Sequence, residues 1–168
     1  MMASVVLFGV ADGERMKAAL DIRRTVFVDE QGVPLEEEID EHDLSDADAV
    51  HALAYQDDAP RGTGRFYESE PGCAQIGRMA VLPAHRDAGV GRTVLDALVG
   101  EALRRGYVRA RLIAQIRAIP FYERVGFRVY GEPILDGGIL HQPMEVLWKT
   151  IANPAGNRTA GVDGHGAP

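Results

Sequence analysis

A strand-like segment, a glycine-rich loop and an amphipathic helix follow one another in the middle of the chain, and this succession restricts the fold more than any other feature. The segment CAQIGRMAV (73–81) is typical of a strand, and Pro83 ends it. Residues 91–105 place apolar side chains on one helical face. The loop RDAGVGRT (86–93) lies between them. The succession predicts an α/β domain built in layers.

The flanking segments predict the other elements, in the overall order β-α-β-β-β-α-β-α-β-β. Strands are expected at 4–10, 50–56, 61–69, 108–115, 127–131 and 143–150. One helix is expected to begin after the N-cap residue Asp12, and a short one is expected within 116–126. We predict one domain over 1–151, with a mixed, mostly antiparallel sheet flanked by helices. Residues 152–168 have too little apolar content to order themselves and are expected to form a disordered tail.

Composition indicates a cytoplasmic protein that binds neither nucleic acid nor membrane. The net charge of −7 lacks the basic excess that phosphate backbones require. Cys73 is the only cysteine, which excludes an intrachain disulfide and suits a reducing compartment. The N-terminal residues lack the basic and apolar regions of a signal peptide. No apolar run approaches the roughly 18 residues of a membrane span.

The glycine loop fits neither of two common phosphate-binding motifs. A P-loop would need a glycine where Arg86 stands and a lysine where Arg92 stands. A dinucleotide fingerprint that uses Gly89 and Gly91 would need a third glycine at Val94. The residues do match R-x-x-G-x-G. Alone, that pattern is also met by an ordinary glycine-rich turn between a strand and a helix.

A second motif makes the resemblance more specific. Gln115 ends a strand, and a short helix with FYE (121–123) and GF (126–127) follows about 30 residues after the glycine loop. In this order the two motifs resemble the GNAT superfamily of N-acetyltransferases. The stretches RRTVFVDEQGVPLEEEIDEHD and GGILHQPME are similar to its ElaA-like and YjcF-like branch. The resemblance covers roughly residues 4 to 150.

The resemblance implies an enzyme that uses acetyl-CoA as co-substrate. The loop would hold the pyrophosphate with backbone N–H groups at a helix N-terminus. A backbone N–H near Val81 would donate to the oxyanion, and Tyr122 would act as general acid, although Tyr122 could instead be a packing residue. The residues expected to bind acetyl-CoA are Met79, Ala80, Val81, Arg86, Asp87, Ala88, Gly89, Val90, Gly91, Arg92, Thr93, Gln115 and Tyr122.

The general base is less well defined by the sequence. We expect Glu38 or Glu30 to accept the amine proton through water, with His51 and His141 as alternatives. Each has a structural alternative: the acidic run 36–43 as a solvated loop, Glu30 as a partner of Arg23 or Arg24, and His51 as a sheet histidine. The residue spacings indicate no metal site.

The chain is therefore predicted to be an N-acetyltransferase that transfers acetyl to a primary amine by direct attack, without a covalent acyl-enzyme. A non-catalytic acyl-CoA-binding module is an alternative, and a nucleotide-binding domain is a weaker one. The acceptor is a small-molecule or peptide amine that the sequence does not identify. The sequence also leaves open whether the protein forms a homodimer.

Overall fold

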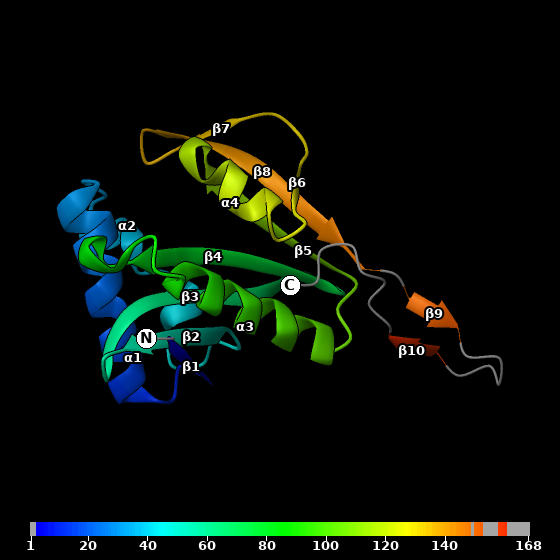
Figure 1. Cartoon of the computed structure of the whole chain (residues 1–168), viewed down its shortest axis with the longest axis horizontal. Coiled ribbons are helices and arrows are strands. Elements are labelled where there is room, and N and C mark those ends of the chain that lie inside the picture. The colour runs from blue at the N-terminus through cyan, green and yellow to red at the C-terminus, as the bar shows by residue number, and fades with distance from the viewer. Residues whose placement is uncertain (1–2, 149, 153–157, 161–168) are drawn as a thin grey trace. The chain divides into compact units, whose positions relative to one another are not determined.

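The computed structural model describes residues 3–148, 150–152 and 158–160, which form two compact units (Figure 1). The first unit contains the residues up to Tyr67 together with Gly77–Leu98, and the second contains Glu68–Ile76 and the residues from Val99 onward. Strand β4 (Cys73–Val81) and helix α3 (Val90–Arg104) each run from one unit into the other.

The first unit is built on strands that follow the predicted boundaries closely. β1 (Ser4–Phe8) pairs antiparallel with β2 (Val50–Gln56), and β2 pairs antiparallel with β3 (Ala59–Glu70). Asp57 and Asp58 join β2 to β3 with positive φ angles of 54° and 59°, which suits a two-residue hairpin turn.

Helices cover both faces of these strands. Because side chains alternate along a strand, Leu53 and Gly64 belong to opposite faces of the β2–β3 pair. Leu53 packs in a core with side chains of α1 (Gly13–Arg23), whereas a Cβ on Gly64 would lie 2.9 Å from Val94 of α3. The glycines of β3 therefore allow α3 to approach its backbone closely.

The helix after Asp12 continues beyond α1 in a changed form. The Asp12 side chain accepts a hydrogen bond from the Arg15 N–H (3.2 Å), so it caps α1 as predicted. The π-helical segment η1 (Arg24–Glu30) then extends the helix to Glu30.

The acidic run 36–43 is only in part the solvated loop that its composition suggested, because Glu36, Glu37 and Glu41 are exposed and Glu38 is buried. It contains the short helix α2 (Leu35–Glu38) and the 3₁₀ turn η2 (Glu41–Asp43). Glu38 is only 4% exposed, and the Asp43 side chain is only 1% exposed. Burial is tolerated because arginines from other elements pair with both carboxylates.

The second unit is built around β8 (Ile139–Leu147). β8 pairs antiparallel with β5 (Arg109–Gln115), β6 (Arg128–Val129) and β7 (Ile134–Asp136), and β5 pairs parallel with the first residues of β4. The 3₁₀ turn η4 (Ile116–Ala118) and helix α4 (Ile119–Glu123) follow β5. The mostly antiparallel pairing agrees with the prediction.

The segment between the expected strands 127–131 and 143–150, which we expected to be a loop, contains a hairpin. Gly137 and Gly138, with φ of 60° and 77°, form the turn between β7 and β8, which places His141 inside a strand. Its Nδ1 lies 2.7 Å from the Ile139 carbonyl oxygen.

Little of the predicted tail is described. β9 (Thr150–Ala152) and β10 (Arg158–Ala160) pair antiparallel, and residues 153–157 and 161–168 lie outside the described residues. The domain boundary at residue 151 therefore stays a prediction. Among the described helices, none combines the length and apolar character needed to cross a membrane.

Candidate active site

The glycine loop has the backbone geometry of an anion site at a helix N-terminus. The 3₁₀ turn η3 (Pro83–His85) leads into it, and Asp87 and Gly89 have φ of 62° and 83°. The Thr93 N–H and hydroxyl both donate to the Gly89 carbonyl oxygen, at 3.0 and 2.9 Å. A Cβ on Gly89 would have no neighbour within 4 Å, so the space beside the loop is open. α3 starts at this loop, and the first backbone N–H groups of any α-helix have no hydrogen-bond acceptor within the helix.

Three of the predicted site residues meet at the base of this loop. The Arg86 Nε donates to the Val81 carbonyl oxygen (3.0 Å), and its two terminal nitrogens donate to Glu30 at 2.9 and 2.7 Å. Glu30 therefore pairs with Arg86, a partner that the sequence did not suggest. These contacts tie the end of β4 to the end of η1.

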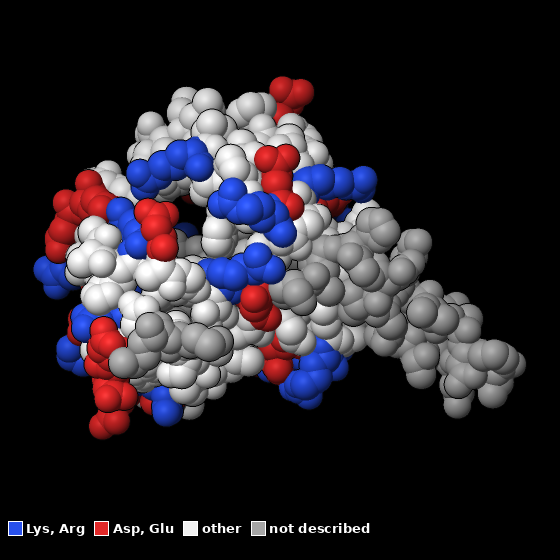
Figure 2. Space-filling model, viewed as in Figure 1, with Lys and Arg blue, Asp and Glu red and all other residues white. Residues whose placement is uncertain are grey.

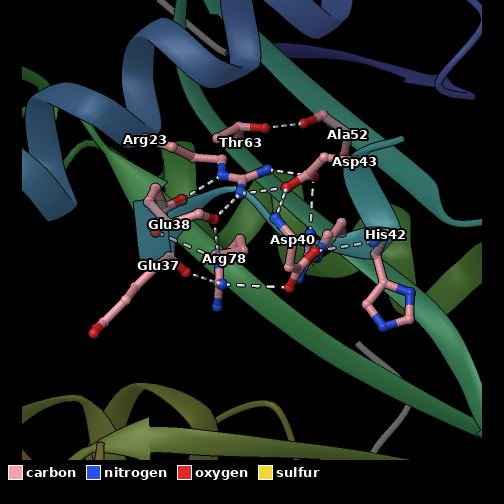
Figure 3. A network of polar contacts seen from close by, with 10 residues as sticks. Arg23, Glu37, Glu38, Asp40, His42, Asp43, Ala52, Thr63 and Arg78 are labelled. Atoms are coloured by element: carbon pink, nitrogen blue, oxygen red, sulfur yellow. Dashed lines mark hydrogen bonds and ion pairs between the residues drawn. The ribbon is translucent and has the colours of Figure 1, made fainter. Parts of the chain in front are cut away.

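A buried network of charged side chains lies beside β2 and β3 in the same unit (Figure 3). Asp43 is held by Arg23 at 2.7 and 2.9 Å and by Arg65 at 2.8 Å. Arg23 Nε also donates to Glu38 (2.6 Å), and Arg65 binds both oxygens of Asp40 at 2.8 and 2.6 Å. The network thus joins α1 and β3 to the acidic stretch.

Charge pairing keeps Asp43 and Asp40 ionised. Burial alone would raise the pKa of Asp43, but hydrogen bonds from Arg23 and the charge of Arg65 outweigh burial and hold the pKa well below its ordinary value of 3.8. For Asp40, the hydrogen bonds and charge of Arg65 likewise outweigh burial and lower the pKa. Both carboxylates are therefore negative partners for the arginines at neutral pH.

His51 is buried against this network. It is 1% exposed, its ring stacks on Phe8 at a centroid distance of 5.6 Å, and its Nε2 has no hydrogen-bond partner among the described residues. Burial lowers its pKa from 6.5 to about 4; Asp43 opposes this shift, while Arg65 and Arg23 add to it. His51 is therefore neutral at pH 7.

We expect this histidine to make stability depend on pH. Because the unfolded chain binds a proton at His51 near pH 6.5 and the folded chain does not, stability is retained above pH 6.5 and falls as the pH decreases toward 4. The free energy of unfolding should fall by about 2 kcal/mol between pH 7 and pH 5. Urea titrations of wild type and His51→Gln would measure this, and the variant should lose most of the slope. Parallel pH curves for the two proteins would contradict the assignment.

Tyr122 and Gln115 lie in the second unit, Tyr122 in α4 and Gln115 at the end of β5. Tyr122 is 8% exposed, and its ring makes edge contacts with Phe121 and Phe127 at 5.0 and 6.1 Å. A phenol with the ordinary pKa of 10 is already protonated at neutral pH, and burial raises the pKa of the Tyr122 hydroxyl further, well above that value. Gln115 ends β5 opposite His141.

The exposed charges are mixed in sign. Figure 2 shows Lys and Arg side chains interspersed with Asp and Glu side chains on the face drawn. In the part of the chain that the structure describes, no group of three or more His, Cys, Asp or Glu side chains is arranged to hold a metal ion. Cys73 is buried.

Comparison with known proteins assigns the chain to a family. The model of an acetyltransferase (GNAT) domain matches residues 22–148. The chain belongs to the GNAT acetyltransferase family. A Bacillus subtilis protein described as the uncharacterized N-acetyltransferase YjcF is 41% identical over 132 residues, which cover 78% of this chain and 91% of that protein.

Solved structures confirm the predicted GNAT fold. Escherichia coli ElaA superposes with a TM-score of 0.75 at 26% identity, covering 86% of this chain and 99% of that chain. An acyl-CoA N-acyltransferase from Pseudomonas aeruginosa also has a TM-score of 0.75, at 28% identity and with the same coverage. The chain therefore has the single-domain acyl-CoA N-acyltransferase fold, with a mixed sheet flanked by helices.

Both candidate bases of this GNAT protein are already engaged. Glu30 is paired with Arg86, and Glu38 is paired with Arg23 and Arg78. Either carboxylate would have to exchange guanidinium contacts for an amine or a water. The assignment of a base to Glu38 or Glu30 stays a prediction.

Most of the network residues were not among the site residues predicted from the sequence. Arg23, Arg65 and Arg78 carried no recognisable motif of their own, although arginines near a dense acidic run could have suggested pairing.

Proposed function

We propose that this protein is an acetyl-CoA-dependent N-acetyltransferase of the cytoplasm that acetylates a primary amine by direct attack on the thioester. The observation that carries the proposal is the open glycine loop at the start of α3, where Gly89 has a positive φ and no neighbouring atoms in its side-chain direction. Backbone N–H groups and the positive end of the helix dipole favour a pyrophosphate at such a position.

The chain's own residues supply the remaining roles. Acetyl-CoA would bring the activated acyl group. A backbone N–H in the segment 79–81 would donate to the carbonyl oxygen as negative charge develops on it. The Tyr122 hydroxyl, which is protonated at neutral pH, would donate a hydrogen bond to the departing sulfur. A fold relative from Thermoplasma acidophilum, the PaiA N-acetyltransferase, was solved with coenzyme A, and its 17% identity supports the fold alone.

Release of free CoA tests this function. The purified protein would be incubated with acetyl-CoA and a panel of amines that includes polyamines, amino sugars, amino acids and peptide N-termini, and the free thiol would be measured. Amine-dependent thiol release supports the proposal. Binding of CoA without release from any amine would instead indicate a non-catalytic acyl-CoA-binding module, and stronger thermal stabilisation by ATP than by acetyl-CoA would indicate a nucleotide-binding domain.

Replacing Tyr122 with phenylalanine should separate catalysis from binding. The change removes the proton donor while keeping the ring between Phe121 and Phe127, so we expect kcat to fall roughly 100-fold and the Kd for acetyl-CoA to change less than about 3-fold. Steady-state kinetics and calorimetric titration measure the two quantities. An equal loss of both would mean that Tyr122 acts through packing.

A further inference from the structure

Arg78 has a backbone conformation that is unusual for its place in the chain. It lies inside β4 with φ of 53°, in the left-handed region that residues with a side chain rarely adopt. Positive φ occurs at three other non-glycine residues of the described chain, and these lie in turns or loops: Asp57, Asp58 and Asp87. Strain of this kind persists only where surrounding contacts hold it.

The Arg78 side chain supplies such contacts. Its Nε lies 3.3 Å from the Glu38 carbonyl oxygen and 3.4 Å from a Glu38 carboxylate oxygen, and its Nη2 lies 3.4 Å from both the Glu37 carbonyl oxygen and Asp40 Oδ2. Each contact is long for a hydrogen bond. Together they direct the guanidinium toward one short segment, residues 37–40, as Figure 3 shows.

That segment is itself held in place by the buried network. Glu38 is bound by Arg23, which is 1% exposed, through both its carboxylate and its carbonyl oxygen. Asp40 is bound by Arg65 and also caps η2 through the His42 N–H. Arg78 therefore contacts a segment that Arg23 and Arg65 also bind.

We infer that Arg78 is a positioning residue, whose anchored side chain holds β4 in the left-handed turn that directs the following N–H groups, those of Met79, Ala80 and Val81. The inference rests on the proposed function, in which this segment donates to the acetyl carbonyl oxygen. Donors of this kind act only when their direction is set before the reaction. The glycine loop lies further along the chain and does not depend on Arg78 for its contacts.

The test compares three substitutions at Arg78 with Arg104→Ala, which deletes an arginine that is paired with Glu101 and exposed. We expect Arg78→Ala to lower kcat at least ten-fold, with the Kd for CoA changed less than two-fold. Arg78→Lys keeps the charge but cannot reach several acceptors at once, so it should recover part of kcat. Arg78→Gly accepts the positive φ and removes the anchor, so it should fold well and yet be no more active than the alanine variant. Arg104→Ala should match the wild type.

Nitrogen-15 amide shifts of Ala80 and Val81, which are not bonded directly to the substituted residue, provide a readout that needs no turnover. They should move in Arg78→Ala and Arg78→Gly and stay in place in Arg104→Ala. Unchanged shifts, or wild-type kcat in folded Arg78→Gly, would overturn the positioning role and leave the proposed function intact. A wild-type protein that transfers acetyl to no amine would refute the proposed function, while the shifts would still decide whether Arg78 sets the geometry of β4.

Discussion

Replacing Asp43 with asparagine is expected to lower the free energy of unfolding by about 3–5 kcal/mol. The Asp43 side chain is 1% exposed and accepts hydrogen bonds from Arg23 and Arg65, whose own side chains are 1% and 4% exposed. Asparagine has nearly the same shape but no charge, so it would leave two buried guanidinium groups with too little negative charge. Because small proteins are stable by only about 5–15 kcal/mol, the loss would be a large fraction of the total.

Urea unfolding measures the effect, and Asp21→Asn is the matched control. Asp21 is paired with Lys17 at 2.9 Å, but the two side chains are 64% and 78% exposed. An exposed pair contributes about 0–1 kcal/mol, so the same chemical change should have little effect there. A loss below about 1 kcal/mol for Asp43→Asn would show that the network does not stabilise the fold as its burial indicates.

Replacing Gly89 with glutamate is expected to weaken binding of CoA at least 100-fold. The new carboxylate would lie beside the first N–H groups of α3, where we place the pyrophosphate, and would repel it while competing for the same donors. No atom within 4 Å would block its Cβ, so the substitution should not disrupt packing. The positive φ of 83° adds a destabilisation of about 1–2 kcal/mol.

Two further variants separate these effects in calorimetric titrations with CoA. Gly89→Ala has the same backbone penalty without the charge and should weaken binding only several-fold. Gly100→Glu adds the same carboxylate to an exposed position of α3 that also has open space, and it should bind CoA like the wild type. If Gly89→Glu binds CoA within two-fold of the wild type, the loop does not hold the pyrophosphate.

Local patterns in the sequence were sufficient for most strands and helices. The strand boundaries of β2 and β4 agree with the predicted ranges 50–56 and 73–81, and α3 is displaced by one residue at each end from the predicted 91–105. These segments have strong apolar periodicity and end at turn residues, which are both local properties. The GNAT motifs were equally readable, because each one is contiguous.

The acidic run is a segment for which local sequence patterns did not predict the structure. Eight consecutive residues with six carboxylates, 36–43, are typical of a solvated surface. Glu38, Asp40 and Asp43 turn inward, because arginines at positions 23, 65 and 78 reach them from α1, β3 and β4, whereas the other three carboxylates of the run stay exposed. Burial of a charge depends on a partner that is distant in sequence, and a single sequence does not show which arginine is that partner.

The sequence by itself determined the order of the longer strands and helices, although not α2 and β7, the glycine loop before a helix and, through two contiguous motifs, the family. Only the tertiary structure decided that Glu30 pairs with Arg86, that Glu38 and Asp43 are buried and paired, and that Arg78 lies in a left-handed turn held by residues 37–40. The physical reason is range: propensity and periodicity act over a few residues, whereas pairing, burial and pKa depend on groups that the fold brings together from separate segments.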